Sequence, residues 1–309
     1  MTRVLVTGAT GFCGRPLAAR LAHEGYEVGA VVRQSPSPPL PDGATVTVQP
    51  DLAEPIDWPP LLAGIDAVVH LAGIAHTRGI AEDRYDRINH RATAALAIAA
   101  RRAGIGHFVF VSSIRAQSGP AADHVLTEGD APAPTDAYGR SKLAAEAAVA
   151  AAGVPFTILR PVLIYGPGQK GNLSALARLA SLPGPLPLGA FANRRSLLGV
   201  GNFVAAILFV LKNPATRGET YVVADPRPIA LADIVAALRT GLGRKPGLIP
   251  MPARLIEIAA RAIGGGALWE RIGGELIADP AKLIAAGWSP DPDTTAALTA
   301  SVRAPQPAA

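Results

Sequence analysis

Short apolar runs recur along the first half of the chain and are separated by stretches in which apolar and polar residues mix. Val4, Leu5 and Val6 form the first run, a pattern typical of a strand buried on both faces. Similar runs predict strands at 27–33, 45–48, 65–71, 108–112 and 156–160. Apolar residues at helical spacing predict helices at 15–25 and 81–103 and one that begins at Ala137. This alternation indicates an α/β fold with a doubly wound parallel sheet of the Rossmann type.

Shorter strands and helices alternate in the rest of the chain, at 220–223, 230–241, 252–263, 267–276 and 280–286. They predict a smaller C-terminal α/β substrate domain formed by 166–195 and 225–303. The dinucleotide-binding domain is then expected to hold 1–165, with 196–224 returning to it. The Pro- and Ala-rich tail, 304–309, is expected to be disordered.

Three glycines mark the passage from the first strand to the first helix. Gly8, Gly11 and Gly14 follow one another at a spacing of three residues. A side chain at these positions would block a pyrophosphate from the turn, and the free N–H groups at the start of a helix attract negative charge. The second strand closes a unit of about 30 residues, as a dinucleotide fold requires. The sequence therefore predicts a nucleotide site here.

Arg33 ends the second predicted strand, about 20 residues beyond the glycines, where a dinucleotide fold places the group that meets the adenosine ribose. An acidic residue there would bind the ribose 2′-hydroxyl, whereas a guanidinium attracts a 2′-phosphate. Arg33 therefore predicts NADP as the cofactor, with NAD as the alternative.

Composition excludes several other classes of protein. The 309 residues carry a net charge of +5 with scattered arginines, so no nucleic-acid surface is expected. The longest apolar run, 203–211, is too short to span a bilayer, and the N-terminus opens directly into a strand, so we expect a cytoplasmic protein without a membrane segment. Cys13 is the only cysteine, which excludes an intrachain disulfide, and is expected to be a small buried hydrophobe. His70 and His76 lack a third ligand at metal spacing, so no metal site is expected.

Candidate chemistry gathers after the fifth strand. Ser112 and Ser113 follow this strand at the carboxyl edge of the sheet, where an open α/β fold places its ligand. Tyr138 and Lys142 are four positions apart and share one face of the next helix. An ordinary tyrosine, with a pKa near 10, is protonated at neutral pH. The Lys142 ammonium and a positive nicotinamide are expected to lower this pKa.

A glycine loop, a serine at a strand end and, 25 positions later, Tyr-x-x-x-Lys occur in this order. This order resembles the extended short-chain dehydrogenase/reductases, the NAD(P)-dependent epimerase/dehydratase family, over residues 2–290. The resemblance implies that Ser113, Tyr138 and Lys142 are catalytic and that Asn89 helps to fix their geometry. It also implies a homodimer that pairs the helices holding Asn89 and Tyr138.

The resemblance further implies binding residues for the cofactor and the substrate. Asp51 and Leu52 would contact adenine, and the segment PVLIYGPG, which begins at Pro161, would line the nicotinamide. Asn172 and Arg195, with Ser113, would bind a substrate that carries a nucleotide diphosphate. The expected cofactor contacts are Gly8, Thr10, Gly11, Phe12, Cys13, Gly14, Arg33, Asp51, Leu52, Leu71, Ala72, Gly73, Val111, Ser112, Tyr138, Lys142 and Pro161.

The family contains several reactions, which the sequence separates in part. A 4,6-dehydratase would carry adjacent Asp and Glu after the serine, but Ile114 and Arg115 stand there. An epimerase keeps NAD bound, whereas Arg33 favours exchangeable NADPH. The segments RRSLLGVGNFV and YVVADPRPIALADIVAALRTGLGRKP also resemble bacterial 4-keto sugar reductases often labelled UDP-glucose 4-epimerase-like. We therefore expect NADP-linked reduction of a nucleotide-activated 4-keto sugar. The alternatives are a UDP-sugar 4-epimerase with retained NAD, a reductase of non-sugar ketones or aldehydes, and a non-catalytic nucleotide-sensing regulator.

Overall fold

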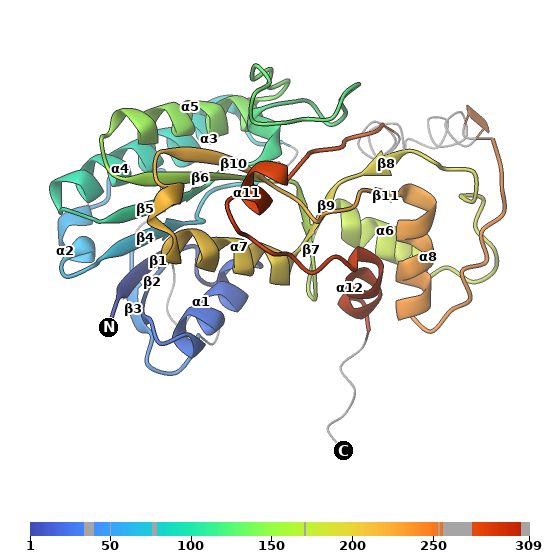
Figure 1. The fold of residues 1–309 in the computed structure, drawn as a ribbon, viewed down its shortest axis with the longest axis horizontal. Helices are drawn as coiled ribbons and strands as arrows, with labels where there is room; N and C mark the ends of the chain where they lie inside the picture. The colour runs from blue at the N-terminus through green and yellow to red at the C-terminus, as the bar shows by residue number, and fades with distance from the viewer. Residues whose placement is uncertain are drawn as a thin grey trace.

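A seven-stranded sheet forms the centre of the protein (Figure 1). The computed structural model describes residues 1–33, 40–49, 51–75, 79–169, 171–252, 254–255 and 274–303. All paired strands of this sheet are parallel, in the order β10-β6-β5-β4-β1-β2-β3, which confirms the predicted doubly wound fold. The strands are β1 (Arg3–Thr7), β2 (Glu27–Val32), β3 (Thr45–Val48), β4 (Ala67–His70), β5 (His107–Val111), β6 (Phe156–Pro161) and β10 (Glu219–Val223).

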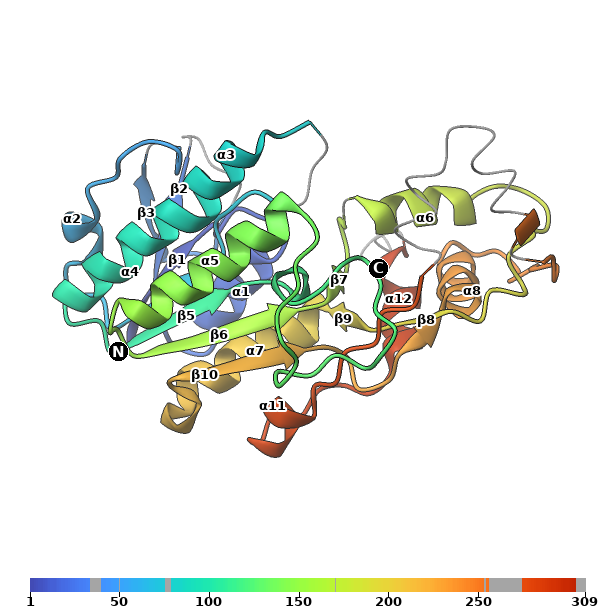
Figure 2. The same cartoon turned by 90° about the horizontal axis from the view of Figure 1, so that it is seen from above.

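Helices cover both faces of the sheet (Figure 2). One face packs against α1 (Gly14–His23) and α7 (Val200–Lys212), and the other against α2 (Trp58–Leu62), α4 (Ala92–Arg102) and α5 (Ala137–Ala151). Since successive strand residues point to opposite faces, Val4 and Val6 of β1 join the first core and Leu5 joins the second. The apolar runs of the central strands are therefore continuous because both of their faces are covered, whereas the edge strand β3 is largely exposed.

The remaining elements form a smaller layer beside the carboxyl end of β6 (Figures 1 and 2). A third apolar cluster holds them together. Short strands pair as β7 (Leu163–Tyr165) with β9 (Leu197–Gly199) and β8 (Arg194–Arg195) with β11 (Ile229–Ala230). The longer helices are α6 (Asn172–Ala180), α8 (Leu231–Gly241) and α12 (Thr294–Ser301). The exact boundaries between the two predicted domains stay a prediction.

A buried carboxylate ties the smaller layer to the sheet. Asp225, which follows β10, accepts hydrogen bonds from the Tyr165 hydroxyl at 2.9 Å and from the Gly199 N–H at 3.0 Å. The Asn202 amide donates to it at 2.7 Å. These donors come from β7, β9 and α7, so one side chain fixes three elements on the substrate side.

The predicted single helix over 81–103 is wrong in its interior. The structure has α3 (Glu82–Tyr85), the π-helical turn η1 (Asp86–Arg91) and then α4. A π turn carries one more residue per turn than an α-helix and often occurs at functional sites. Apolar periodicity spans all three pieces, so it does not show the wider turn. Asn89 lies within η1.

Other differences from the predicted elements are small. The strand predicted at 65–71 occupies only Ala67–His70, and the helix predicted from 230 begins at Leu231, after β11. Three helical turns, η2 (Ile114–Ala116), η3 (Pro214–Thr216) and α11 (Ala281–Ala285), complete the elements of the described residues.

Some predictions fall outside the described residues. These are the tail 304–309, His76, and most of the segments 252–263 and 267–276. At the end of the last segment, Leu276 forms a β-bridge with Arg195. Within the described ranges, none of the helices combines the length and the apolar character that crossing a membrane requires.

Candidate active site

The glycine loop connects β1 to α1 at the carboxyl edge of the sheet. β1 lies between β2 and β4, and the chain turns back through the Gly11 N–H, which donates to the Gly8 carbonyl at 3.0 Å. A Cβ at Gly14 would lie only 2.1 Å from this carbonyl and 2.7 Å from the Ala9 Cα. Only glycine permits this packing, which brings the start of α1 against the loop. The geometry therefore fits a dinucleotide's phosphates.

The ends of the neighbouring strands complete this edge. The Ala72 N–H donates to the Thr7 hydroxyl at 3.2 Å, which joins the segment after β4 to the end of β1. Leu52 is buried, whereas the side chain of Arg33 is 72% exposed at the end of β2. Nη1 of Arg33 forms a long ion pair with Oδ2 of Asp51, at 3.8 Å. The Arg33 guanidinium is therefore largely exposed to solvent even with this ion pair.

Cys13 belongs to this loop but is not set up as a nucleophile. Burial raises the pKa of its thiol to about 12. A reactive thiol has a lowered pKa, so the structure agrees with the interpretation of Cys13 as a packing residue.

Ser113 and Tyr138 lie together. Ser113 is the extended residue before η2, and its Oγ accepts a hydrogen bond from the Arg115 N–H at 3.1 Å. The same side chain is hydrogen-bonded to Tyr138, in the first turn of α5. Asp136 caps this helix by accepting from the Gly139 N–H at 2.7 Å. A strand end and a helix start therefore bring the two predicted catalytic hydroxyls into contact.

The expected lowering of the tyrosine pKa is not a property of the protein alone. Burial raises the pKa of Tyr138 above its ordinary value. The hydrogen bond to Ser113 and the charge of Arg115 oppose this effect, whereas Asp136 and Tyr85 add to it. Tyr138 is therefore a protonated phenol at neutral pH in this structure.

Lys142 is buried and directed at the sheet. Its Nζ donates to the Val111 carbonyl at 2.7 Å and lies 4.5 Å from the centre of the Phe110 ring. Burial lowers the pKa of Lys142 to about 8, and the nearby Glu146 carboxylate opposes this. The ammonium is thus held at the end of β5, on the same helix face as Tyr138.

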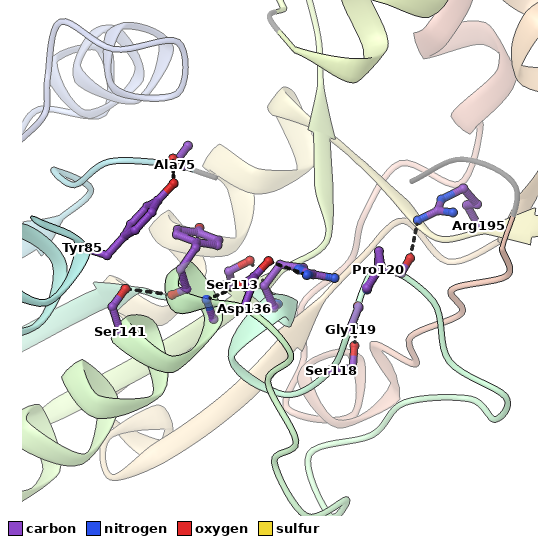
Figure 3. Close-up of polar contacts among 12 residues, drawn as sticks. Ala75, Tyr85, Ser113, Ser118, Gly119, Pro120, Asp136, Ser141 and Arg195 are labelled. Carbon is purple, nitrogen blue, oxygen red and sulfur yellow. Dashed lines mark hydrogen bonds and ion pairs between the residues drawn. The ribbon is translucent and has the colours of Figure 1, made fainter. Parts of the chain in front are cut away.

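Asn89 joins the segment after β4 to the helix of Tyr138. Its Oδ1 accepts from the Ile74 N–H at 2.9 Å, and its Nδ2 donates to the Ile74 carbonyl at 3.0 Å and to the Ser141 Oγ at 3.1 Å. Ser141 in turn donates to the Tyr138 carbonyl at 2.8 Å (Figure 3). Tyr85 packs edge-on against the Tyr138 ring, with centres 6.0 Å apart. The π turn thus directs a polar side chain at Ser141, whose hydroxyl in turn binds the Tyr138 carbonyl.

Both ring nitrogens of His70 form hydrogen bonds within the core. Its two ring nitrogens lie 2.7 Å from the Thr7 Oγ1 and 2.9 Å from the Thr93 Oγ1. Because Thr93 donates its proton to the Asn89 carbonyl, it must accept from Nε2 of His70, and Thr7 must then donate to Nδ1. Burial lowers the pKa of His70 to about 3, so the ring is neutral. Among the described residues, no group of three His, Cys, Asp or Glu side chains is placed to hold a metal.

A buried ion pair behind the site was not predicted from the sequence. Arg160 of β6 donates to Oε2 of Glu146 at 2.7 Å, and both side chains are less than a tenth exposed. Glu146 also accepts from the Ser112 hydroxyl, and Arg160 donates to Oε1 of Gln117 at 3.0 Å. The one available signal was the position of Glu146, four residues after Lys142 on the same helix face.

On the substrate side, Arg195 ties two distant segments together. Its guanidinium donates to the Pro120 carbonyl at 2.9 Å (Figure 3). It also donates to the Gly274 carbonyl at 2.7 Å. Burial, helped by the charge of Arg115, lowers the pKa of Arg195 to about 10. Asn172 begins α6, as predicted, but its side chain lies outside the described part of the structure.

The loop that holds Pro120 runs beside the chain after Gly274. The N–H groups of Ala122 and Leu126 donate to the carbonyls of Glu275 and Ile277, each at 2.9 Å. The Asp279 N–H returns a hydrogen bond to the Leu126 carbonyl at 2.8 Å. The two segments are therefore paired through their backbones.

Known proteins resemble this chain over most of its length. The family model for the NAD-dependent epimerase/dehydratase family matches residues 4–224. A UDP-glucose 4-epimerase from Vibrio cholerae is 30% identical over 93% of this chain and 90% of its own length. A ceramide reductase from Caulobacter vibrioides is 31% identical over 81% of this chain and 73% of its own length.

Solved structures show the same arrangement. The structure of MoeE5 in complex with UDP-glucose and NAD superposes with a TM-score of 0.77, at 26% identity and 97% coverage of both chains. The chain is therefore an extended short-chain dehydrogenase/reductase, an enzyme of the NAD-dependent epimerase/dehydratase family.

Proposed function

We propose that the enzyme uses NADPH to reduce a ketone of a nucleotide-activated sugar, most simply a 4-keto sugar. A bound nicotinamide cofactor supplies the hydride. The protein supplies the proton, the orientation of the substrate and the binding of the phosphates. Each of these tasks falls to residues described above.

The proposed proton donor is Tyr138. The Ser113 hydroxyl binds the substrate carbonyl oxygen, and the Tyr138 phenol protonates that oxygen as it becomes an alcohol. A raised pKa suits this direction because the phenol still holds its proton at neutral pH. Lys142 is proposed to hold the nicotinamide ribose, and Asn89 to fix the helix that carries Tyr138.

The proposal of NADPH rather than NADH rests on Arg33. Its guanidinium is 72% exposed at the end of β2, and its ion pair with the Asp51 carboxylate is long, at 3.8 Å, so a phosphate can compete for it. A 2′-phosphate would offer this guanidinium a charge-assisted, bidentate partner. A cofactor that exchanges after each turnover is what a net reduction requires.

A second candidate is a UDP-sugar 4-epimerase. The Vibrio cholerae relative named above is a UDP-glucose 4-epimerase, and MoeE5 was solved with UDP-glucose and NAD. An epimerase would use the same serine and tyrosine but return the hydride to the sugar, so no cofactor would be consumed.

An assay separates the two reactions. The purified enzyme is incubated with a UDP-4-keto-6-deoxy-sugar and NADPH, and in parallel with UDP-glucose and with UDP-galactose without added cofactor. Loss of NADPH absorbance with formation of the alcohol supports reduction. Interconversion of the two UDP-hexoses without net change in the cofactor would replace the proposal with the epimerase.

Replacing Arg33 with alanine should weaken the binding of NADPH but not that of NADH. Since a hydrogen bond to a charged group contributes about 1.5–3 kcal/mol, we expect the KM for NADPH to rise at least tenfold, with the KM for NADH little changed. Arg20→Ala, which removes another exposed arginine paired with Glu24, is the matched control. Equal changes for both cofactors would show that Arg33 does not read the 2′-phosphate.

We also propose a cytoplasmic homodimer formed through η1, α4 and α5. The outer face of α5 carries the small residues Ala144, Ala147 and Ala148, which permit close approach of a second helix, and α4 adds the exposed Ile98. Light scattering at micromolar concentration should give twice the 31.7 kDa chain mass. A nucleotide-sugar substrate carries charged phosphates, which do not cross a membrane readily. The enzyme is therefore proposed to act in the cytoplasm, where such a substrate would be made.

A further inference from the structure

Arg115 connects the two elements that carry Ser113 and Tyr138. It lies two residues after Ser113, in η2, and its Nη2 lies 2.6 Å from Oδ2 of Asp136. Asp136 lies two residues before Tyr138 and caps α5 through its other oxygen. The two charged side chains are only 18% and 23% exposed. A largely buried ion pair therefore joins the turn of one hydroxyl to the helix of the other (Figure 3).

The backbones of these elements are also in direct contact. A Cβ at Gly139 would lie 2.2 Å from the Arg115 carbonyl oxygen. Glycine is therefore required next to Tyr138, and η2 packs directly on the first turn of α5. A displacement of Arg115 would move Ser113 relative to Tyr138.

The guanidinium of Arg115 is not fully neutralised by this pairing. Its Nη1 is buried and has no hydrogen-bond partner among the described residues. An N–H group shielded from water keeps its positive potential directed at its neighbours. The charge of Arg115 also acts on Tyr138 and on Arg195 and lowers the pKa of each.

We propose that Arg115 is a positioning residue of this enzyme, which holds Ser113 and Tyr138 together through Asp136 and stabilises negative charge on the Tyr138 oxygen. The proposal rests on the proposed roles of Ser113 and Tyr138.

The sign of the effect follows from the groups around the phenol. Asp136, Tyr85 and burial raise the pKa of Tyr138, whereas Arg115 and the hydrogen bond from Ser113 lower it. Lys142 lies on the same helix, one turn further along. Removal of the Arg115 charge should therefore raise the pKa of Tyr138, and the phenolate should form only at higher pH.

The test is a titration of phenolate absorbance. Tyr138 is isolated from the other four tyrosines by subtraction of the Tyr138→Phe curve, with and without saturating NADP⁺. We expect Arg115→Gln to move the midpoint upward by about one pH unit. Arg115→Lys, which keeps the charge, should stay near the wild-type midpoint.

Arg140→Gln is the matched control because it removes an arginine from the turn of α5 that holds Tyr138. Arg140 is half exposed and pairs with Glu82 at 2.6 Å, so its loss should leave the midpoint unchanged. Equal shifts for Arg115→Gln and Arg140→Gln would overturn the proposal, as would a shift of a full unit in Arg115→Lys. The lysine variant keeps the test decisive if Arg115→Gln does not fold.

The pH profile of kcat/KM, in whichever assay gives turnover, provides a second readout and should move in the same direction as the titration. Failure of the role proposed for Arg115 can be distinguished from failure of the proposed function. If Tyr138→Phe retains full turnover, the catalytic proposal itself fails. If Tyr138→Phe is inactive but Arg115→Gln leaves both midpoint and profile unchanged, only the role of Arg115 is wrong.

Discussion

Replacing Tyr138 with phenylalanine should lower kcat by about a hundred- to ten-thousand-fold, the usual contribution of a general acid or base. The substitution removes only the hydroxyl that is hydrogen-bonded to Ser113. The ring, which packs against Tyr85, stays in place. The change should therefore affect turnover much more than binding or folding, which steady-state kinetics and thermal unfolding would show.

Tyr85→Phe is the control for this substitution. Tyr85 is buried beside Tyr138, and its hydroxyl donates to the Ala75 carbonyl at 3.4 Å. It loses the same atom at a neighbouring position, so any loss of kcat should be small. A comparable loss in both variants would mean that turnover reports the packing of the two rings rather than proton transfer.

The largest effect on stability is expected from Arg160→Ala. The substitution leaves the Glu146 carboxylate buried without its bidentate partner. Breaking a buried ion pair on one side costs about 3–5 kcal/mol, because an uncompensated charge remains in the core. Denaturation in urea should show this loss as a lower midpoint with little change in slope.

Two further variants identify the cause. Arg140→Ala removes an exposed ion pair with Glu82 and should cost no more than about 1 kcal/mol. The double variant Glu146→Leu with Arg160→Met removes both charges and should recover part of the stability lost in Arg160→Ala. If the double variant were less stable than Arg160→Ala, packing rather than the unpaired charge would explain the loss.

The local sequence was sufficient to predict the sheet and the family. The short apolar runs around Val4–Val6 predicted strands covered on both faces, and the structure and the comparisons confirm the fold. The glycine loop, Ser113 and Tyr138 also lie at the predicted edge. These features depend on neighbours in the chain or on the rule that parallel strands end at one edge. The catalytic and binding roles of individual residues stay predictions.

What the sequence did not show depends on pairs of residues distant in the chain. Glu146 meets Arg160 from another element, and Arg115 meets Asp136 across a loop of some twenty residues. The π turn around Asn89 was not predicted for a different reason. Apolar periodicity is too coarse to reveal one extra residue within a helix. The interaction of Lys142 with the Val111 carbonyl likewise required the placement of β5 beside α5.

The pairing of the 117–133 loop with the chain after Gly274 bears on the design of chimeras. Backbone hydrogen bonds and Arg195 hold the two stretches together. If only the 117–133 loop were taken from a relative, it would have to pair with the chain after Gly274 of this protein, which fits a different loop backbone. Transplants aimed at a new substrate should therefore exchange both stretches at once.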